Sequence, residues 1–437
     1  MHFRPVIRTT PSHTKRVFRR SHKTVPSEVI QNRPFGSHTH PSFRKSYKLA
    51  HSEAIQIRPL RSHNPTFIST QLKGFHTTSD LRMPPSALQT LQQDYPWIHT
   101  PLVIGAPMRL IALSDMAVEI SKAGGLGFIG AGTDVSDLQT HLDKAVTLLS
   151  ATSLPTTDGV LPIGVGFINW GADLKAAIPL IQKYKPAAVW FFAPKSIESL
   201  GEWTAKTRDV SHKTKVWVQV GSVKEARDVV SSVRPDVLVV QGTDAGGHGL
   251  AQGASLISLL PEVSDAVAGM TFQDGYTGPV IVAAGGIADA RGAAAAFVLG
   301  AAGVVLGTRL LAAHEANISR GYQNAVLRAS DGGQSTVRTK VYDNLRGTTG
   351  WAETHNARGV INKSYLDALG GLSEEENKRL YEEEVKKGDS GWGEQARLTT
   401  YAGSAVGLVR EVRGAGEIVK EVRDGAESLL GDARALI

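Results

Sequence analysis

The chain has 437 residues, of which 41% are hydrophobic, so it can build a large core and is not disordered throughout. Its formal net charge of +7 comes from the N-terminus: residues 1–79 hold 14 of the 48 Lys and Arg residues, whereas residues 80–437 carry 34 basic and 39 acidic residues. This distribution argues against a nucleic-acid-binding body, and the absence of cysteine excludes disulfides, thiolate metal sites and a cysteine nucleophile.

Residues 1–82 have the composition of a basic leader. They are rich in Arg, Ser, Thr, His and Pro and show no sustained apolar period, so we expect them to be disordered. Arg-rich, Ser-rich and acid-poor N-termini are typical of mitochondrial transit peptides. The alternative is a start codon set upstream of a natural N-terminus at Met83. We therefore expect a mitochondrial location if the leader is real, and a cytoplasmic one otherwise.

From Leu102 onward, apolar runs of strand length alternate with amphipathic stretches of helical period. Eight such units predict an α/β protein with a TIM (β/α)8 barrel over residues 83–330; a doubly wound open sheet is the alternative. No apolar run approaches about 18 uncharged residues, so we predict no membrane span. The predicted strands cover residues 102–108, 126–130, 161–168, 187–193, 215–220, 237–242, 279–285 and 303–307, and the clearest helices residues 114–124, 135–150, 223–233 and 288–300.

Residues 331–437 are too many for one closing helix. The stretch 343–360, DNLRGTTGWAETHNARGV, has the composition of a loop. Residues 372–388 and 406–437 are charged, with apolar residues three or four apart as in amphipathic helices. We expect this mostly helical C-terminal extension to pack over one end of the barrel as a lid.

The sixth predicted strand ends in a motif that we interpret as the rim of an active site. In VLVVQGTDAGGHGL, residues 237–250, a buried strand leads to His248 in a frame of glycines. Barrel enzymes place their chemistry just past the carboxyl ends of the strands, and imidazole accepts protons near neutral pH. We predict that His248 is a general base; the alternative is a structural histidine. Asp244 either orients the ring or caps the turn, and capping is favoured.

Strands seven and eight end in AAGGI and LGTR, which predict a phosphate site. Small residues at two adjacent loops let backbone N–H groups converge on a phosphate, and a helix N-terminus follows each loop. The residues concerned are Gly285, Gly286, Gly307 and Thr308. Arg309 either adds charge to this site or faces solvent, and the sequence does not decide between the two.

Strand one ends in GAPM, where Ala106, Pro107 and Met108 offer backbone against which a flat ligand can lie. The alternative is a simple strand exit with Met108 in the core. A flat, phosphate-bearing ligand beside an imidazole suggests FMN, which supplies the redox chemistry while the protein supplies position and a proton acceptor. No carboxylate pair, histidine cluster or HExxH motif indicates a metal.

Together, GAPM, GGLGFIGAG, QGTDAGGHG, AAGGIADARGAAAA and LGTR resemble, in this order, the nitronate monooxygenase family, formerly called 2-nitropropane dioxygenases. The resemblance covers about residues 95–320, and the C-terminal segment is similar to that of fungal members. It implies an FMN-dependent TIM barrel that oxidises alkyl nitronates with O2 to carbonyl compounds and nitrite, without a metal.

Residue by residue, the resemblance makes His248 the catalytic histidine, which deprotonates a neutral nitroalkane; an anionic nitronate needs no such step. It also implies two sets of cofactor contacts. The flavin would contact Ala106, Pro107, Met108, Gln241 and Gly246, and its phosphate Gly285, Gly286, Gly307 and Thr308.

The partners implied are a small nitronate and O2, with no nucleic acid and no membrane, and a homodimer is allowed. Related barrels include NADH:quinone reductases and flavin-dependent enoyl-thioester reductases, so an FMN-dependent NAD(P)H oxidoreductase is the alternative function. A barrel that binds a ligand without catalysis is a third reading, which the glycine frame of His248 disfavours.

Overall fold

The computed structural model describes residues 85–156, 159–273 and 275–434. All of them lie in one compact unit, residues 73–437. The leader predicted over residues 1–82 lies outside the described residues.

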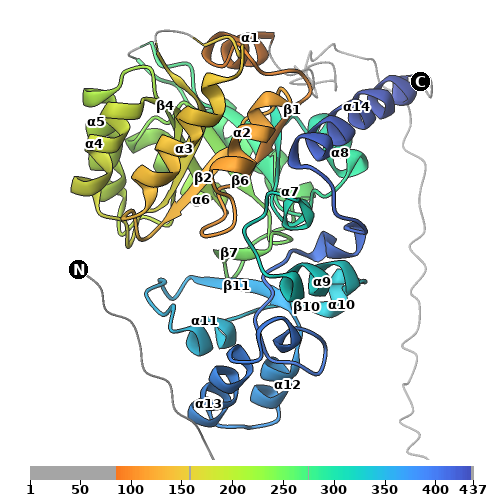
Figure 1. Cartoon of the computed structure of the whole chain (residues 1–437). Helices are drawn as coiled ribbons and strands as arrows, with labels where there is room; N and C mark the ends of the chain where they lie inside the picture. The colour runs from red at the N-terminus through yellow and green to blue at the C-terminus, as the bar shows by residue number, and fades with distance from the viewer. Residues whose placement is uncertain (1–84, 157–158, 274, 435–437) are drawn as a thin grey trace, which may run out of the picture. The chain divides into compact units, whose positions relative to one another are not determined.

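Eight parallel strands form the barrel that the sequence predicts (Figure 1). The sheet runs from β1 round to β2, and its two ends meet where the Gly105 N–H donates to the Leu126 carbonyl at 3.0 Å. An open doubly wound sheet would leave these ends apart, so that alternative is excluded. The strands are β1 (Leu102–Gly105), β2 (Phe128–Gly132), β3 (Leu161–Ile168), β4 (Pro186–Phe192), β5 (Lys215–Val220), β6 (Val237–Gln241), β8 (Val280–Ala284) and β9 (Gly303–Leu306).

Strand β6 illustrates why these segments are continuous apolar runs. Val237 and Val239 belong to the cluster inside the barrel, whereas Leu238 and Val240 pack against the outer helices. Both faces are therefore buried, as is usual for a parallel sheet covered by helices. Gln241 follows in phase with Val239, which directs it to the inside of the barrel at its carboxyl end.

Eight helices surround the strands, and the last of them comes from the end of the chain. Helix α14 packs against α8 and α2, so it fills the position between the last and the first βα units. Its residues Ile418, Val419 and Val422 belong to the same buried cluster as the other outer helices. The helices are α2 (Ser114–Lys122), α3 (Leu138–Ser150), α4 (Leu174–Tyr184), α5 (Ile197–Val210), α6 (Val223–Ser232), α7 (Leu256–Ala268), α8 (Ala290–Val298) and α14 (Ala415–Arg434).

The amino end of the barrel is closed by aromatic side chains. Helix α1 (Pro85–Asp94) leads to Tyr95, which is fully buried and accepts a hydrogen bond from the Trp217 indole at 2.8 Å. Trp217 stacks on Trp190 with 5.9 Å between ring centroids. This end is filled, so a ligand site inside the barrel has to open at the carboxyl end.

Between β9 and α14 the chain forms a cap, which we define as residues 313–414. Its strands β10 and β11 pair with β7, which comes from the loop after β6, to form an antiparallel cap sheet in the order β10-β11-β7 (Figure 1). The loop predicted over 343–360 is therefore wrong at both ends: residues 343–346 belong to α11, and residues 355–360 form β11, which gains partners on both sides. The added elements are β7 (Gly247–Leu250), η2 (Thr308–Ala312), α9 (Arg320–Arg328), α10 (Gly332–Ser335), β10 (Thr336–Thr339), α11 (Val341–Arg346), β11 (His355–Val360), α12 (Lys363–Leu369), α13 (Glu374–Val385), η3 (Gly388–Gly391) and η4 (Ser404–Leu408).

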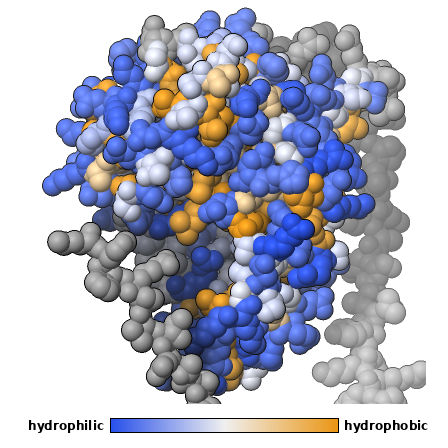
Figure 2. Space-filling model, in the orientation of Figure 1, coloured by the Kyte–Doolittle hydropathy of each residue, from blue (hydrophilic) through white to orange (hydrophobic). Residues whose placement is uncertain are grey.

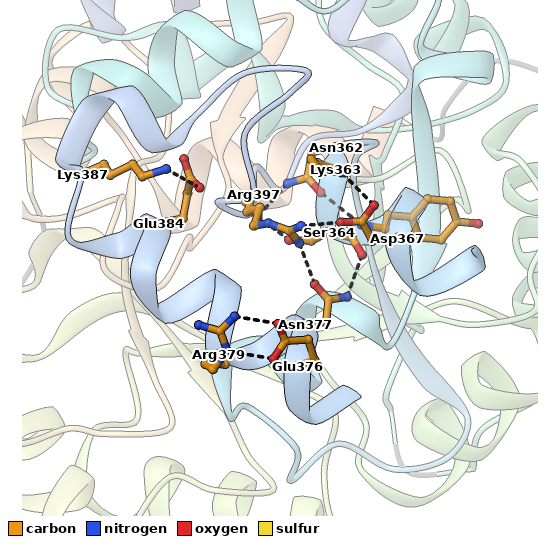
Figure 3. A network of polar contacts seen from close by, with 11 residues as sticks. Asn362, Lys363, Ser364, Asp367, Glu376, Asn377, Arg379, Glu384, Lys387 and Arg397 are labelled. Carbon is orange, nitrogen blue, oxygen red and sulfur yellow. Dashed lines mark hydrogen bonds and ion pairs between the residues drawn. The ribbon is translucent and has the colours of Figure 1, made fainter. Parts of the chain in front are cut away.

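A buried polar network ties the helices of the cap to the segment that leads into the site (Figure 3). Arg397 is 6% exposed, forms an ion pair with Asp367 and donates to the Asn377 side-chain oxygen at 3.1 Å. The Arg397 carbonyl accepts from the Asn362 amide and the Ser364 hydroxyl, each at 2.9 Å. These bonds hold the backbone just before residue 401 in one place.

The face of the molecule in Figure 2 is mostly hydrophilic, with hydrophobic residues in small groups. Within the described ranges, no helix is long and apolar enough to cross a membrane.

Candidate active site

His248 lies past the carboxyl end of β6, as the motif predicted, but on a strand of its own. The chain turns through Gly247, whose φ of +66° lies in the left-handed region that favours glycine. Strand β7 then pairs with β11, which places His248 opposite Ala357. The Gln241 amide reaches the His248 backbone carbonyl at 3.4 Å. The cap sheet therefore holds His248 over the barrel mouth.

The ring of His248 contacts a buried carboxylate. Its Nε2 lies 2.8 Å from Oδ1 of Asp343, a residue of α11 that is 4% exposed. The same oxygen accepts the Tyr401 hydroxyl at 3.0 Å and the Thr348 hydroxyl at 2.9 Å. Burial, followed by the negative charge of Asp343, raises the pKa of Tyr401 far above its usual value, so this hydroxyl stays a donor. Sequence reasoning missed Asp343, because nothing in a loop-like stretch 95 residues away links it to His248.

Aromatic rings lie on one face of the His248 imidazole. Trp351 stacks on it with 3.8 Å between centroids and 9° between planes. The ring centroid of Phe192, the last residue of β4, lies 5.8 Å from that of Trp351. The ring centroid of Trp170, which follows β3, lies 5.6 Å from that of Trp351. The barrel and the cap thus build one aromatic wall beside the imidazole, which excludes water from that side.

Two arginines from the cap sheet fasten the loop after β6. Arg338 and Arg358 are paired residues on β10 and β11. Arg338 donates to the Thr243 and Ala245 carbonyls at 3.1 and 3.0 Å, and Arg358 also reaches the Thr243 carbonyl. Burial, and then the charge of Arg358, lowers the pKa of Arg338 to about 10. Both remain cations at neutral pH, so the loop carries a positive field.

The glycines around His248 are required by the chain itself. A Cβ at Gly246 would lie 2.4 Å from the backbone of Ala402 and Gly403, and one at Gly249 would lie 2.6 Å from the Gln241 side-chain oxygen. The sequence interpretation was that something approaches this backbone closely, and for these positions the approaching group is the cap. Asp244 does not orient the ring; its carboxylate accepts from the Ser404 hydroxyl at 3.0 Å.

The loops after β6, β8 and β9 converge. Gly285 and Gly286 have φ values of +95° and +78°, and a Cβ on Gly285 would lie 2.8 Å from the Gly242 carbonyl oxygen. The Thr308 hydroxyl accepts from the Gly403 N–H at 2.9 Å. The N–H groups of Gly286, Gly307 and Thr308 donate no hydrogen bond to any described residue. Converging free N–H groups at a helix start are what an anionic group binds.

Arg309 fits neither of its two predicted roles. It is 5% exposed, and its guanidinium donates to the Glu411 carbonyl at 3.2 Å. Burial lowers its pKa. It therefore joins the barrel to the end of the cap instead of facing solvent or a phosphate.

The contacts that the structure gives the exit of β1 are structural, and its predicted contact with a flat ligand stays a prediction. The Ala106 N–H continues the ladder to the Leu306 carbonyl at 2.9 Å. Pro107 sits against Gly166, where a Cβ would lie 2.2 Å from its ring. Met108 packs against the buried clusters of both barrel and cap. The alternative prediction, in which Met108 lies in the core, is therefore correct for part of its side chain.

Two buried donors after β3 have no partner. The Asn169 side-chain oxygen accepts from the Phe192 N–H at 2.9 Å, but the Asn169 amide nitrogen and the Trp170 indole N–H bond to no described residue. Unpaired buried donors cost about 1–3 kcal/mol each. A bound group with acceptors would satisfy them. Sequence reasoning missed both residues, because the third strand end carries no glycine motif.

No group of three or more His, Asp or Glu side chains that could hold a metal ion occurs in the described part of the chain.

Comparison with known proteins places the chain in a family. A family model described as nitronate monooxygenase matches residues 177–425. The chain is 50% identical over 347 residues to a nitronate monooxygenase of Metarhizium robertsii, covering 78% of this chain and 95% of that protein. It is 37% identical over 381 residues to a nitronate monooxygenase of Neurospora crassa, covering 82% and 98%.

Among solved structures, FabK from Thermotoga maritima shares the fold, with a TM-score of 0.61 and 23% identity over 80% of this chain and 99% of that one. The alignments with the two nitronate monooxygenases extend over 347 and 381 residues. Both proteins share far more sequence identity with this chain than the solved structure does. The chain therefore belongs to the nitronate monooxygenase family of oxidoreductases.

Proposed function

We propose that the protein is an FMN-dependent enzyme that oxidises alkyl nitronates with O2 to carbonyl compounds and nitrite. The observation that carries the proposal is the 50% identity to a nitronate monooxygenase along a chain that holds the imidazole of His248 at the barrel mouth. Small nitronates fit such a mouth, because the aromatic wall of Trp351 and Phe192 accepts an alkyl chain.

The residues present fit FMN. Gly286, Gly307 and Thr308 offer free N–H groups to a phosphate. The N–H groups of Arg291 and Gly292 at the start of α8 are not available, because they donate to the Asp289 carboxylate. A side chain at Gly285 or Gly286 would meet the loop after β6, and the buried Asn169 amide and Trp170 indole are donors that acceptors on a bound group would satisfy. When bound, FMN supplies the electron-transfer chemistry with O2.

The protein's own residues then have separate tasks. Arg338 and Arg358 keep the site positive, which favours an anionic nitronate over neutral competitors. His248 takes the α-proton of a neutral nitroalkane and is idle when the substrate is already a nitronate. Trp351 covers one face of the His248 imidazole and keeps water from that face.

The test is one sequence of measurements on the purified full-length protein. We expect a flavin spectrum, FMN released on denaturation at one per chain, and O2 consumption with nitrite formation on adding propyl-2-nitronate. We expect NADH to leave the spectrum unchanged under anaerobic conditions.

Rapid bleaching by NADH together with slow nitronate turnover would move the protein to the NAD(P)H oxidoreductases. A colourless protein that FMN does not reconstitute would refute the cofactor assignment. A bound FMN with neither activity would leave a binding protein.

A further inference from the structure

We propose that Asp343 is a positioning residue that holds His248 in the tautomer with its proton on Nε2, so that Nδ1 is the atom that accepts the substrate proton. The proton transfer to Nδ1 rests on the proposed function. The tautomer of His248 rests only on the hydrogen-bond geometry of its ring.

The hydrogen bonds at Asp343 set the tautomer. Its Oδ1 accepts two hydroxyl donors, from Tyr401 and Thr348, and faces the His248 Nε2 at 2.8 Å. A nitrogen lone pair at that distance would oppose an oxygen lone pair. The contact is therefore a bond only if Nε2 carries a proton.

The second ring nitrogen is left for the substrate. His248 Nδ1 has no hydrogen-bond partner among the described residues, since the Gln241 amide bonds to the backbone carbonyl and not to the ring. Trp351 stacks at 3.8 Å on one ring face, which limits rotation of the imidazole. One face and one nitrogen are thus occupied, and the edge that bears Nδ1 is free.

The proton transfer is then defined at both ends. The C–H bond next to the nitro group of a neutral nitroalkane breaks, its electron pair forms the nitronate, and its proton moves to Nδ1. The resulting imidazolium keeps its Nε2–H on Asp343, whose carboxylate stabilises the new positive charge. A nitronate substrate skips this step, so Asp343 matters for one substrate form only.

Other charged or titratable groups surround the pair on every side. Tyr401 touches the Asp343 oxygen, and the Arg346 guanidinium lies over the Tyr401 ring. His355 on β11 and Arg338 on β10 lie on the sheet side. Burial, and then the charges of His248 and Arg338, lowers the pKa of His355, so positive charges on His248 and His355 oppose each other. Asp343 is the one carboxylate in this set, and it offsets that repulsion.

The first experiment compares the variant Asp343→Asn with wild-type holoenzyme on nitroethane and on ethylnitronate. We expect kcat/KM for nitroethane to fall about 10²- to 10⁴-fold, mainly in kcat, and the constants for ethylnitronate to change less than about threefold. His248→Asn sets the limit for complete loss of the base. Asp137→Asn is the matched control, because Asp137 faces His141 at 3.5 Å on the exposed side of α3, and it should change neither substrate.

Tyr401→Phe removes one donor and keeps the carboxylate, and should cost less than about tenfold.

The second experiment observes the tautomer without substrate. In full-length protein with ¹⁵N-labelled histidine, we expect the His248 signals of an Nε2–H tautomer, identified by their loss in His248→Gln. A wild-type ring protonated on Nδ1 would overturn the proposal, and this readout holds even if Asp343→Asn does not fold.

Equal losses on both substrates in a folded Asp343→Asn variant would also overturn the proposal. A wild-type protein that oxidises no nitronate but shows the Nε2–H tautomer would refute the proposed function and keep the positioning role.

Discussion

Gly246 is a position at which the cap packs directly against the loop that carries His248. Its missing side chain leaves space for the backbone of Ala402 and Gly403, which continues directly from Tyr401. The Ser404 N–H bonds to the Asp244 carbonyl at 2.9 Å, so this contact couples cap position to loop position. A methyl group at Gly246 would displace the backbone of Ala402 and Gly403, and this displacement would lower the stability of the packed interface.

We therefore expect Gly246→Ala to lower the free energy of unfolding by about 1–3 kcal/mol through overpacking. Gly253→Ala is the control, since its Cβ would have only ordinary contacts at 3.7 Å or beyond. Thermal unfolding of both variants measures the difference. Equal melting temperatures would mean that the cap moves freely on the loop.

At this scale the sequence was sufficient for His248 but not for its partner. A histidine in a glycine frame after a buried strand is a local signal, readable within ten residues. Asp343, Tyr401 and Trp351 reach the ring only because β11 pairs with β7 and brings the cap over the barrel. The sequence predicted that something approaches these glycines closely. In the structure, the approaching groups are the cap backbone at Gly246 and the Gln241 side chain at Gly249.

At the scale of elements, α14 shows how a helix can be predicted and its role missed. The spacing of apolar residues indicated a helix near the C-terminus, yet nothing in that pattern says what covers it. In the structure the Arg423 guanidinium donates to the Ala123 carbonyl at 2.8 Å, and the apolar face fills the gap between α2 and α8. In the sequence, the cap residues come between β9 and the helix α14 that completes the barrel.

Truncation of Ile418 in α14 tests this closing role. Ile418 is fully buried, so Ile418→Ala should lower the free energy of unfolding by about 2–5 kcal/mol. Leu429→Ala removes the same kind of side chain from the same helix, but Leu429 is 38% exposed, and the cost should stay below about 1 kcal/mol. Urea unfolding of the two variants gives both values. Similar small losses would show that α14 is dispensable for the barrel.

For the whole molecule, the joint between barrel and cap holds a histidine that should make stability depend on pH. His355 of β11 contacts Phe192 of β4, with 5.7 Å between centroids, and so lies in this joint. Burial, and then the charges of His248 and Arg338, lowers its pKa from 6.5. A histidine with a lower pKa when folded binds protons more readily when unfolded. Its contribution to stability is complete above pH 6.5 and is lost as pH falls toward the folded-state pKa.

We expect the wild-type melting temperature to fall more between about pH 7.5 and about pH 5.5 than that of His355→Gln, by roughly 1–3 °C. The exposed His212→Gln is the control and should behave as wild type. Parallel pH curves for wild type and His355→Gln would contradict a role of this histidine in the joint.

By itself, the sequence determined the eight strands, most of their helices, the position of His248 and the glycine-containing loops after β8 and β9, whose binding of phosphate stays a prediction. These features depend on short-range patterns, since alternating burial and permissive turns are written within a few residues. Only the tertiary structure decided that α14 closes the barrel, that β7 and β11 form one sheet, and that Asp343 meets His248. These contacts join residues about 100 or more positions apart, and they arise from packing that no local pattern encodes.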